Sequence, residues 1–414
     1  MVIAVVGIAA LGLLGAAHWY VWRRLVRDVS GPGSRYRRAG TVLVVLLPVL
    51  SVLALIGGRA FPLAVERWFA WPGYLWLAVL LYLLLALLVG ELLRPLLLRL
   101  PLLRLLPLFR FPRRREIRSA AEVPAEPAAP VVQEEPAAAE PSRRLFVSRV
   151  VAGTAAGVAA GVVGNGAYGV LRGPRVKQVT VPLAKLPRAA HGYRIAVVSD
   201  IHLGPILGRA HTRRIVDTIN ATQPDLIAVV GDLVDGTVPE LGPAARPLAD
   251  LRAKDGAYFV TGNHEYFSGA APWVDFVREL GVHPLENARV ELPWFDLAGV
   301  NDIAGTSQGQ GPDYERALGD RDRGRAAVLM AHQPVTVHDS VRHGVDLQLS
   351  GHTHGGQLWP GNYLAELANP TVAGLERYGD TQLYVTRGAG AWGPPVRVGA
   401  PSDITVVTLA SLRV

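Results

Sequence analysis

Hydrophobic residues follow two different patterns along the chain, and the change of pattern divides it in two. The first part contains four apolar runs: Val2–Trp22, Thr41–Gly58, Gly73–Leu93 and Leu145–Leu171. A helix needs about 20 apolar residues to cross a bilayer, so we expect four transmembrane helices. From residue 172 on, the apolar runs are short and alternate with helical stretches such as His211–Ala221, which predicts an α/β domain.

The two patterns predict four segments. Residues 1–119 form a membrane region with three spans and a basic cytoplasmic segment, and residues 145–171 form the fourth span. Residues 120–144 between them are rich in Ala, Pro and Glu, which is typical of an extended, disordered linker. Residues 172–414 form the folded domain, which is long enough to bury a core of its own.

Arginine placement predicts the orientation of the spans, because short cytoplasmic loops carry an excess of Lys and Arg. Arginines fill the loop between the first two spans and follow the third. We therefore expect the N-terminus outside, residues 94–144 inside and residues 172–414 outside the cell membrane. Arg143 and Arg144, before the last span, resemble a twin-arginine export signal, although an ordinary basic flank is the alternative. Gly153, Gly157 and Gly161 repeat at a spacing that favours close helix packing within a membrane.

The charge distribution argues against binding to nucleic acid. The chain has a net charge of +8, but residues 1–120 hold 16 Lys and Arg against 4 Asp and Glu. Residues 172–414 hold 23 against 25. A nucleic-acid-binding protein carries its basic patch on the folded domain, whereas here the basic residues belong to the membrane region.

Candidate metal ligands follow short apolar runs in the folded domain. The runs read as buried strands and are Arg194–Val198, Leu226–Val230, Ala257–Val260, Ala326–Met330 and Leu347–Leu349. The seven candidate ligands just after them are Asp200, His202, Asp232, Asn263, His332, His352 and His354, and His264 stands next to Asn263. In α/β sheets, ligands bind beyond the carboxyl ends of the strands, so one sheet edge can gather all of these side chains.

The ligand types indicate which metals would bind. Carboxylate, imidazole and amide ligands, in a chain without cysteine, suit divalent Mn, Fe or Zn. Seven candidate ligands are too many for one tetrahedral ion, but they fill two sites if one carboxylate bridges. Two ions roughly 3.5–4 Å apart are typical of enzymes that displace a phosphoryl group.

The folded domain resembles the calcineurin-like metallophosphoesterase superfamily in five motifs. In chain order they are Asp-x-His, Gly-Asp, Gly-Asn-His-Glu, a lone His and Gly-His-x-His. The Gly-Gly-Gln that follows is similar to its membrane-associated bacterial branch, which includes the YkuE and YaeI phosphoesterases. The resemblance covers roughly the last 220 residues. It implies a four-layer α/β/β/α sandwich with two mixed sheets, and a dinuclear phosphohydrolase that uses a metal-activated water.

The resemblance also implies a role for each matching residue. One ion would be held by Asp200, His202, Asp232 and His354. The other would be held by Asp232, Asn263, His332 and His352, so Asp232 is the bridge. His264 would protonate the leaving oxygen, and Asp235 would orient His264. Arg387 and Arg397 match features of the same branch and are candidates to bind phosphate, with a surface ion pair as the alternative. The five histidines outside the pattern, expected to be exposed or structural, are His191, His211, His283, His338 and His343.

Three classes of function are compatible with this chain. The first is a membrane-anchored phosphohydrolase for a phosphodiester or pyrophosphate, with lipid-linked and wall-linked substrates favoured by the membrane tether. The second is a catalytically silent metal-binding or sensor domain, which would be expected to have lost a ligand or His264. The third is a transporter, but the spans lack the paired intramembrane acids that mark a substrate path. The intact set of candidate residues favours the enzyme.

Overall fold

The computed structural model describes residues 2–99 and 143–413. The chain forms two compact units, one from residues 1–44 and 82–159 and the other from residues 45–81 and 160–414. The expected linker, apart from its last two residues, lies outside the described residues. The four predicted segment boundaries stay predictions.

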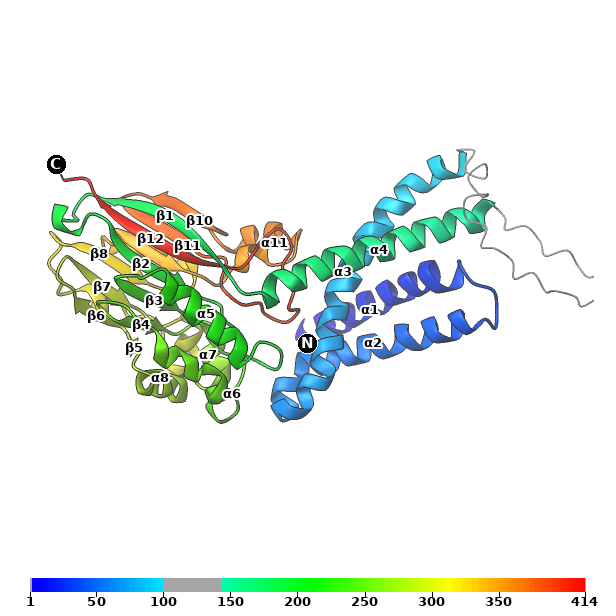
Figure 1. Cartoon of the computed structure of the whole chain (residues 1–414), viewed down its shortest axis with the longest axis horizontal. Coiled ribbons are helices and arrows are strands. Elements are labelled where there is room, and N and C mark those ends of the chain that lie inside the picture. The colour runs from blue at the N-terminus through cyan, green and yellow to red at the C-terminus, as the bar shows by residue number, and fades with distance from the viewer. Residues whose placement is uncertain (1, 100–142, 414) are drawn as a thin grey trace, which may run out of the picture. The chain divides into compact units, whose positions relative to one another are not determined.

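Long helices dominate the first part of the chain (Figure 1). They are α1 (Val2–Trp22), α2 (Arg35–Ala60), α3 (Leu63–Arg99) and α4 (Arg143–Leu171). Among the described residues three helical stretches are long and apolar enough to span a membrane: Arg35–Gly57, Leu63–Arg99 and Arg143–Leu171. They cover the second expected span up to Gly57 and contain the third and the fourth.

Among the described residues the structure therefore supports three spans rather than the four predicted. The run Val2–Trp22 folds as the helix α1 of 21 residues, and its role as a further span stays a prediction. Helix α1 continues into the π-helix Arg23–Arg27, which carries three arginines. On α4, a Cβ added at Gly153, Gly157 or Gly161 would meet no atom within 4 Å of the described structure, so packing of this face against another helix stays a prediction.

The domain that follows contains two six-stranded mixed sheets, as the resemblance implied. The first sheet has the strand order β1-β12-β2-β3-β4-β5, and the second has the order β10-β11-β9-β8-β7-β6. In the first sheet β2, β3, β4 and β5 run parallel, and β12 runs antiparallel to β2. In the second sheet β7, β8, β9 and β11 run parallel, and the edge strands β6 and β10 are antiparallel.

The strands are β1 (Arg175–Leu183), β2 (Tyr193–Val198), β3 (Leu226–Val230), β4 (Ala257–Val260), β5 (His283–Pro284), β6 (Ala288–Glu291), β7 (Phe295–Gly299), β8 (Ala326–Met330), β9 (Leu347–Ser350), β10 (Gly374–Tyr378), β11 (Thr381–Val385) and β12 (Asp403–Ser411). The helices are α5 (Arg209–Ala221), α6 (Val238–Ala245), α7 (Asn263–Ser268), α8 (Ala270–Glu279), α9 (Tyr314–Leu318), α10 (Val337–Arg342) and α11 (Gly361–Ala368).

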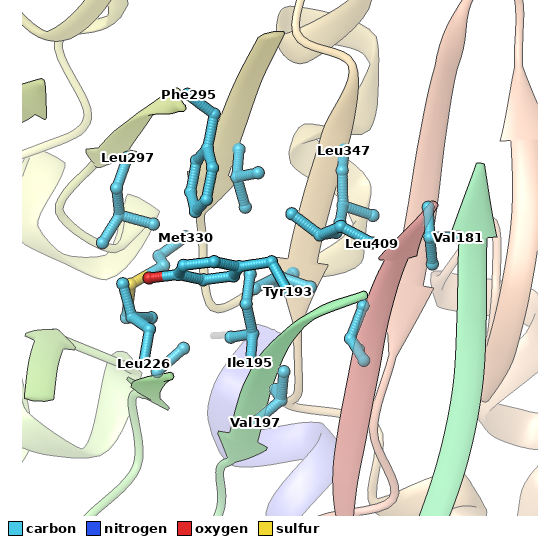
Figure 2. Close-up of a cluster of buried hydrophobic side chains, with 14 of the residues drawn as sticks. Val181, Tyr193, Ile195, Val197, Leu226, Phe295, Leu297, Met330, Leu347 and Leu409 are labelled. Atoms are coloured by element: carbon cyan, nitrogen blue, oxygen red, sulfur yellow. The ribbon is translucent and has the colours of Figure 1, made fainter. Parts of the chain in front are cut away.

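Alternate side chains of each strand enter different hydrophobic clusters, which explains the layers. Ile195 and Val197 of β2 point into the cluster between the two sheets, where Tyr193 meets Phe295 edge to face (Figure 2). Ala196 and Val198, one position along, join the cluster that α5, α6 and α8 cover on the other face. Successive strand residues face opposite sides of a sheet, so a fully apolar strand signals a sheet covered on both faces.

The expected strands at Leu226–Val230, Ala257–Val260 and Ala326–Met330 are confirmed residue for residue. Apolar runs in the sequence also mark β6, β7, β11 and β12, namely Arg289–Leu292, Phe295–Val300, Leu383–Thr386 and Ile404–Leu409. Sequence reasoning missed β1, β5 and β10. Strands β1 and β10 lie at the sheet edges and alternate between exposed and partly exposed residues over most of their length, so they lack the apolar run that marks an inner strand. Strand β5 is only two residues long.

His211 of α5 is buried in the core at 2% exposure, and neither ring nitrogen has a hydrogen-bond partner among the described residues. Burial, with Arg214 and Arg397 nearby, lowers the pKa of His211 from 6.5 to about 3. Below pH 6.5 the unfolded chain therefore takes up a proton that the folded domain does not, and stability falls as the pH drops. We expect the protein to lose roughly 2 kcal/mol of stability between pH 7 and pH 5 through this residue.

Melting temperatures of the detergent-purified protein and of His211→Leu at pH 7 and pH 5 check this. The variant should lose less stability on acidification than the unmodified protein. His191→Leu, an exposed histidine, serves as the control and should behave as the unmodified protein does. Equal acid sensitivity of His211→Leu and the unmodified protein would contradict the argument.

Candidate metal centre

The candidate ligands lie in loops at the carboxyl ends of parallel strands in both sheets. Asp200 and His202 follow β2, Asp232 follows β3, and Asn263 opens α7 just after β4. In the second sheet, His332 follows β8, and the loop with His352 and His354 follows β9. The two sheets therefore supply one site from opposite sides.

The structure brings the acidic and histidine candidates into three overlapping groups. The groups are Asp200 with His202 and His354, His202 with Asp232 and His264, and Asp232 with His332 and His352. Within each group the possible ligand atoms lie within 4.8 Å of one another. Asn263 joins the last group, because its Oδ1 lies 3.0 Å from Nδ1 of His352.

Asp232 occupies the middle of this arrangement and is 2% exposed. Its Oδ2 lies 3.2 Å from Nε2 of His332 and 3.7 Å from Nε2 of His202. Its Oδ1 accepts a hydrogen bond of 2.9 Å from the backbone N–H of His264. Burial alone would raise the pKa of Asp232, but His332 and His202 outweigh it and hold the pKa far below its ordinary value. One buried carboxylate is thus within reach of both outer groups.

Two histidines each use one ring nitrogen for a hydrogen bond to a protein acceptor. The other ring nitrogen points toward the site. Nδ1 of His332 donates to the carbonyl oxygen of Val230 at 2.8 Å, and its Nε2 is buried without a hydrogen-bond partner in the described structure. Nδ1 of His202 lies 2.9 Å from Oδ1 of Asp235, and its Nε2 lies 3.0 Å from Nε2 of His354. A histidine that ligates a metal is commonly held in this way by its other ring nitrogen.

Asp235 contacts two histidines at once. Its Oδ1 lies 2.7 Å from Nδ1 of His264 as well as 2.9 Å from Nδ1 of His202. Burial raises the pKa of Asp235, but His202 and His264 lower it by more than burial raises it, and the pKa is about 2. The carboxylate is therefore negatively charged near neutral pH and orients both rings. Its contact with His202 was not foreseen from the sequence.

The backbone is left-handed at five of the candidate ligands. The φ angles are 52° at Asp200, 48° at His202, 52° at Asp232, 72° at His352 and 53° at His354. A side chain in this region costs roughly 1–2 kcal/mol relative to the right-handed conformation. Such residues persist only where the surrounding structure holds them, and they cluster at functional sites.

Glu265 holds two of these loops together, a role that sequence reasoning missed. It is fully buried, and its carboxylate accepts hydrogen bonds from the backbone N–H groups of Asp232, Leu233 and Gly262. Burial and the nearby Asp232 raise the pKa of Glu265 to about 7. The Gly-Asn-His-Glu motif contained this residue, but its contacts depend on how α7 folds back onto the loop after β3.

Arg397 is 6% exposed, and its guanidinium binds protein atoms. Nε donates to the carbonyl oxygen of Gly390 at 2.7 Å, and Nη1 donates to that of His354 at 3.0 Å. Nη2 lies 3.1 Å from Nδ1 of His354. Arg397 thus supports the His354 loop, which the sequence did not predict. Its expected role in phosphate binding, and that of the half-buried Arg387, stay predictions.

Two exposed aromatic residues flank His264. The ring of Phe267 lies 5.6 Å and the ring of Trp392 lies 5.9 Å from the imidazole, measured between ring centroids. Both also line the pocket into which His202, Asp232, His264, His352 and His354 open. No motif includes these aromatic residues, so sequence reasoning had no signal for them.

Comparison with known proteins gives consistent matches to the domain. Residues 193–356 match the family described as calcineurin-like phosphoesterase. The chain is 38% identical over 250 residues to a "Transmembrane protein with metallophosphoesterase domain" of Danio rerio, and the match covers 57% of each chain. It is 33% identical to an uncharacterized metallophosphoesterase of Aquifex aeolicus, covering 57% of this chain and 91% of the relative. It is 30% identical to the uncharacterized metallophosphoesterase YkuE of Bacillus subtilis, covering 65% and 98%. The match thus spans little more than half the length of the Danio rerio relative.

Gly262 is the position where the site leaves no room for a side chain. A Cβ there would overlap the carboxylate and the backbone nitrogen of Asp232. Gly262→Ala should therefore displace Asp232 and reduce the amount of bound metal. Elemental analysis of protein purified in the presence of Mn²⁺ measures this. Gly208→Ala is the matched control, because a Cβ there meets nothing within 4 Å and its φ is −112°. Two ions per chain in both variants would contradict the prediction.

Proposed function

Because the chain belongs to the calcineurin-like metallophosphoesterase family, we propose that its C-terminal domain is a phosphohydrolase that uses two divalent metal ions. The observation that carries the proposal is the position of Asp232, within reach of a histidine from each of two ligand groups. A shared carboxylate between two such groups is what a two-metal phosphoesterase needs.

The donor set fits such ions. Nε2 of His332 is a buried nitrogen without a hydrogen-bond partner in the described structure, and it faces the Asp232 carboxylate. Nε2 atoms of His202 and His354 face each other at 3.0 Å, an arrangement that a cation between or beside them would stabilise. Imidazole, carboxylate and amide donors suit Mn²⁺, Fe²⁺ or Zn²⁺.

We assign the ligands as the resemblance implied. Asp200, His202, Asp232 and His354 hold one ion, and Asp232, Asn263, His332 and His352 hold the other. Bound there, the ions would supply charge that stabilises the phosphoryl oxygens and a water made reactive at neutral pH. The protein's own part is to hold these side chains rigidly and to manage the proton of the leaving group.

We assign that proton to His264. Its Nδ1 is held by Asp235 at 2.7 Å, and its Nε2 lies 3.9 Å from Oδ2 of Asp232, so the ring is aimed into the site. An imidazole oriented by a carboxylate is a competent general acid near neutral pH. It is also accessible, at 16% side-chain exposure, whereas the side chains of His202 and His332 are fully buried.

We propose a phosphodiester or a pyrophosphate as the substrate, carried by a lipid or a wall polymer. The membrane helices support this choice, because they hold the site near such molecules. Arg387 and Arg397 remain our candidates for phosphate contacts, with Arg387 the better placed of the two because the guanidinium of Arg397 already binds His354.

We propose that residues 172–414 lie outside the cell membrane. The basic loop between α1 and α2 faces the cytoplasm by the positive-inside rule, and α2, α3 and α4 then cross in turn. With three spans the N-terminus would lie in the cytoplasm, and with a further span in α1 it would lie outside. The domain lies outside in both cases. Arg143 and Arg144 stay inside, and we propose the twin-arginine route for export.

Replacing His264 by alanine tests the catalytic role. The turnover number should fall by about 10²–10⁴, the range for loss of a general acid. The fall should be smaller for an aryl phosphodiester, whose leaving group needs no proton, than for an alkyl one. Metal content should stay the same, and His191→Ala should be as active as the unmodified protein. Equal losses on both substrates would contradict the role of His264 as the general acid. If the unmodified protein cleaves no phosphoester, the result would favour a catalytically silent binding domain.

Single cysteines test the topology, because the chain has none of its own. In intact cells, a membrane-impermeant maleimide should label Ala189→Cys in the domain and leave Ala128→Cys in the linker unlabelled until the cells are broken. Lysines at positions 143 and 144 should abolish labelling of Ala189→Cys if export uses the twin-arginine route. Labelling of Ala128→Cys but not of Ala189→Cys in intact cells would reverse the topology.

A further inference from the structure

Helix α11 has no buried residue and carries the most exposed leucine of the domain. Tyr363, Leu364 and Leu367 are 58%, 71% and 85% exposed. At 3.6 residues per turn the three side chains project within an arc of about 100°. A soluble surface rarely leaves such a group in water without a binding partner.

The loop that leads into α11 is joined to the end of α4. Trp359 donates its backbone N–H to the carbonyl oxygen of Val398 at 2.9 Å. One residue earlier, the N–H of Arg397 donates to the carbonyl oxygen of Gly166 in α4 at 3.3 Å. A Cβ at Gly166 would lie 2.7 Å from Val396 and 2.8 Å from the oxygen of Arg397, so the two backbones are in close contact.

This contact lies where α4 leaves the membrane. The helix has no charged residue between Arg149 and Arg172, and about 20 such residues cross a bilayer. Tyr168, with Arg172 against its ring at 5.8 Å, is typical of the boundary between lipid and water. Gly166 lies about one turn before the end of this apolar stretch, so we place it near the membrane boundary, together with the loop that leads into α11.

The same segment is joined to the metal centre. Gln357, three residues after His354, donates its side-chain amide to the carbonyl oxygen of Trp392 at 2.9 Å and accepts from the backbone N–H of Trp392 at 3.0 Å. The ring of Trp392 is 55% exposed and lies beside His264. A continuous path of loops thus runs from α4 through α11 to the rim of the site.

We propose that Tyr363, Leu364 and Leu367 of α11 insert into the lipid–water boundary of the bilayer that α4 spans, and so hold the mouth of the metal centre at the membrane surface. Leucine and tyrosine on one face of a helix, with polar Asn362 and Glu366 on the other, are suited to that boundary. The occupant of this surface is lipid, because α4 places a bilayer next to it.

A consequence, which rests on the function proposed above, concerns the substrate. A site held at the surface meets phosphoesters on membrane-resident amphiphiles at high local concentration, while soluble phosphoesters gain nothing. The exposed rings of Phe267 and Trp392 provide apolar contacts for the hydrocarbon part of such a molecule.

A fluorescent label tests the insertion without any reference to activity. In the cysteine-free chain, Leu367→Cys and Ala189→Cys each carry one nitrobenzoxadiazole group. Each full-length protein is placed as a single copy in nanodiscs with acyl-chain-brominated phospholipid. The label at 367 should lose emission to the bromolipid, and the label at 189 should not.

Ala189 is a suitable control because it is exposed and lies beyond the far end of β1, which runs nine residues from the end of α4, about 30 Å. Equal quenching of the two labels would overturn the proposal. A label at position 367 that is shielded from water but not quenched by bromolipid would also overturn the proposal, because protein rather than lipid would then cover α11.

Activity tests the consequence with two substrates that share one leaving group. Bis(4-nitrophenyl) phosphate is soluble, and phosphatidyl-4-nitrophenol resides in the bilayer. The double variant Leu364→Ser/Leu367→Ser should be about tenfold less active on the lipid substrate, from the loss of apolar contact, and unchanged on the soluble one. Leu412→Ser, at an exposed leucine (61%) two residues before Val414, should change neither rate.

An equal loss on both substrates would point to damage of the site and would overturn the consequence. If the unmodified protein cleaves neither substrate, the proposed function fails, while the labelling result still decides the insertion.

Discussion

The burial of the Asp232 carboxylate is the constraint on which the site depends. Moving a charge out of water costs several kcal/mol unless partners surround it. Here the partners come from far apart in the sequence: His202 follows β2, His264 lies in α7, and His332 follows β8 in the other sheet. The loops therefore have to meet at one point. This requires that the two sheets pack in a fixed relative position, which the contacts of Tyr193, Phe295 and Met330 between them provide. The inter-sheet core positions the metal centre.

Rigidity of the loops follows from the same packing. Asp200, His202 and Asp232 are held in left-handed backbone that each of them would leave in an isolated peptide. Glu265 ties the loop after β3 to the loop after β4 through three backbone hydrogen bonds, and Gly262 lets the two approach. Because a metal ligand displaced by even a small distance binds less well, this strain is the cost of preorganisation.

The parts of the fold that local chemistry determines were predictable. Leu226–Val230 and Ala326–Met330 are apolar at every position, which only an inner strand covered on both faces requires, and the candidate ligands follow such strands directly. Edge strands β1 and β10 lack that pattern. Contacts that depend on three-dimensional placement had no local signal. Glu265, the support that Arg397 gives His354, and the rings of Phe267 and Trp392 belong to that class.

Charge explains why contact between the domain and a membrane would have to be apolar. Residues 172–414 hold 23 basic against 25 acidic residues, so the domain as a whole gains nothing from the negative surface of a bilayer. Only three residues separate the end of α4 at Leu171 from the start of β1 at Arg175, and Gly166 is packed against the Arg397 backbone. A tether this short leaves the domain few orientations in which α11 is far from lipid. Under that restriction, exposed Leu364 and Leu367 are better explained as a membrane contact than as a liability for aggregation.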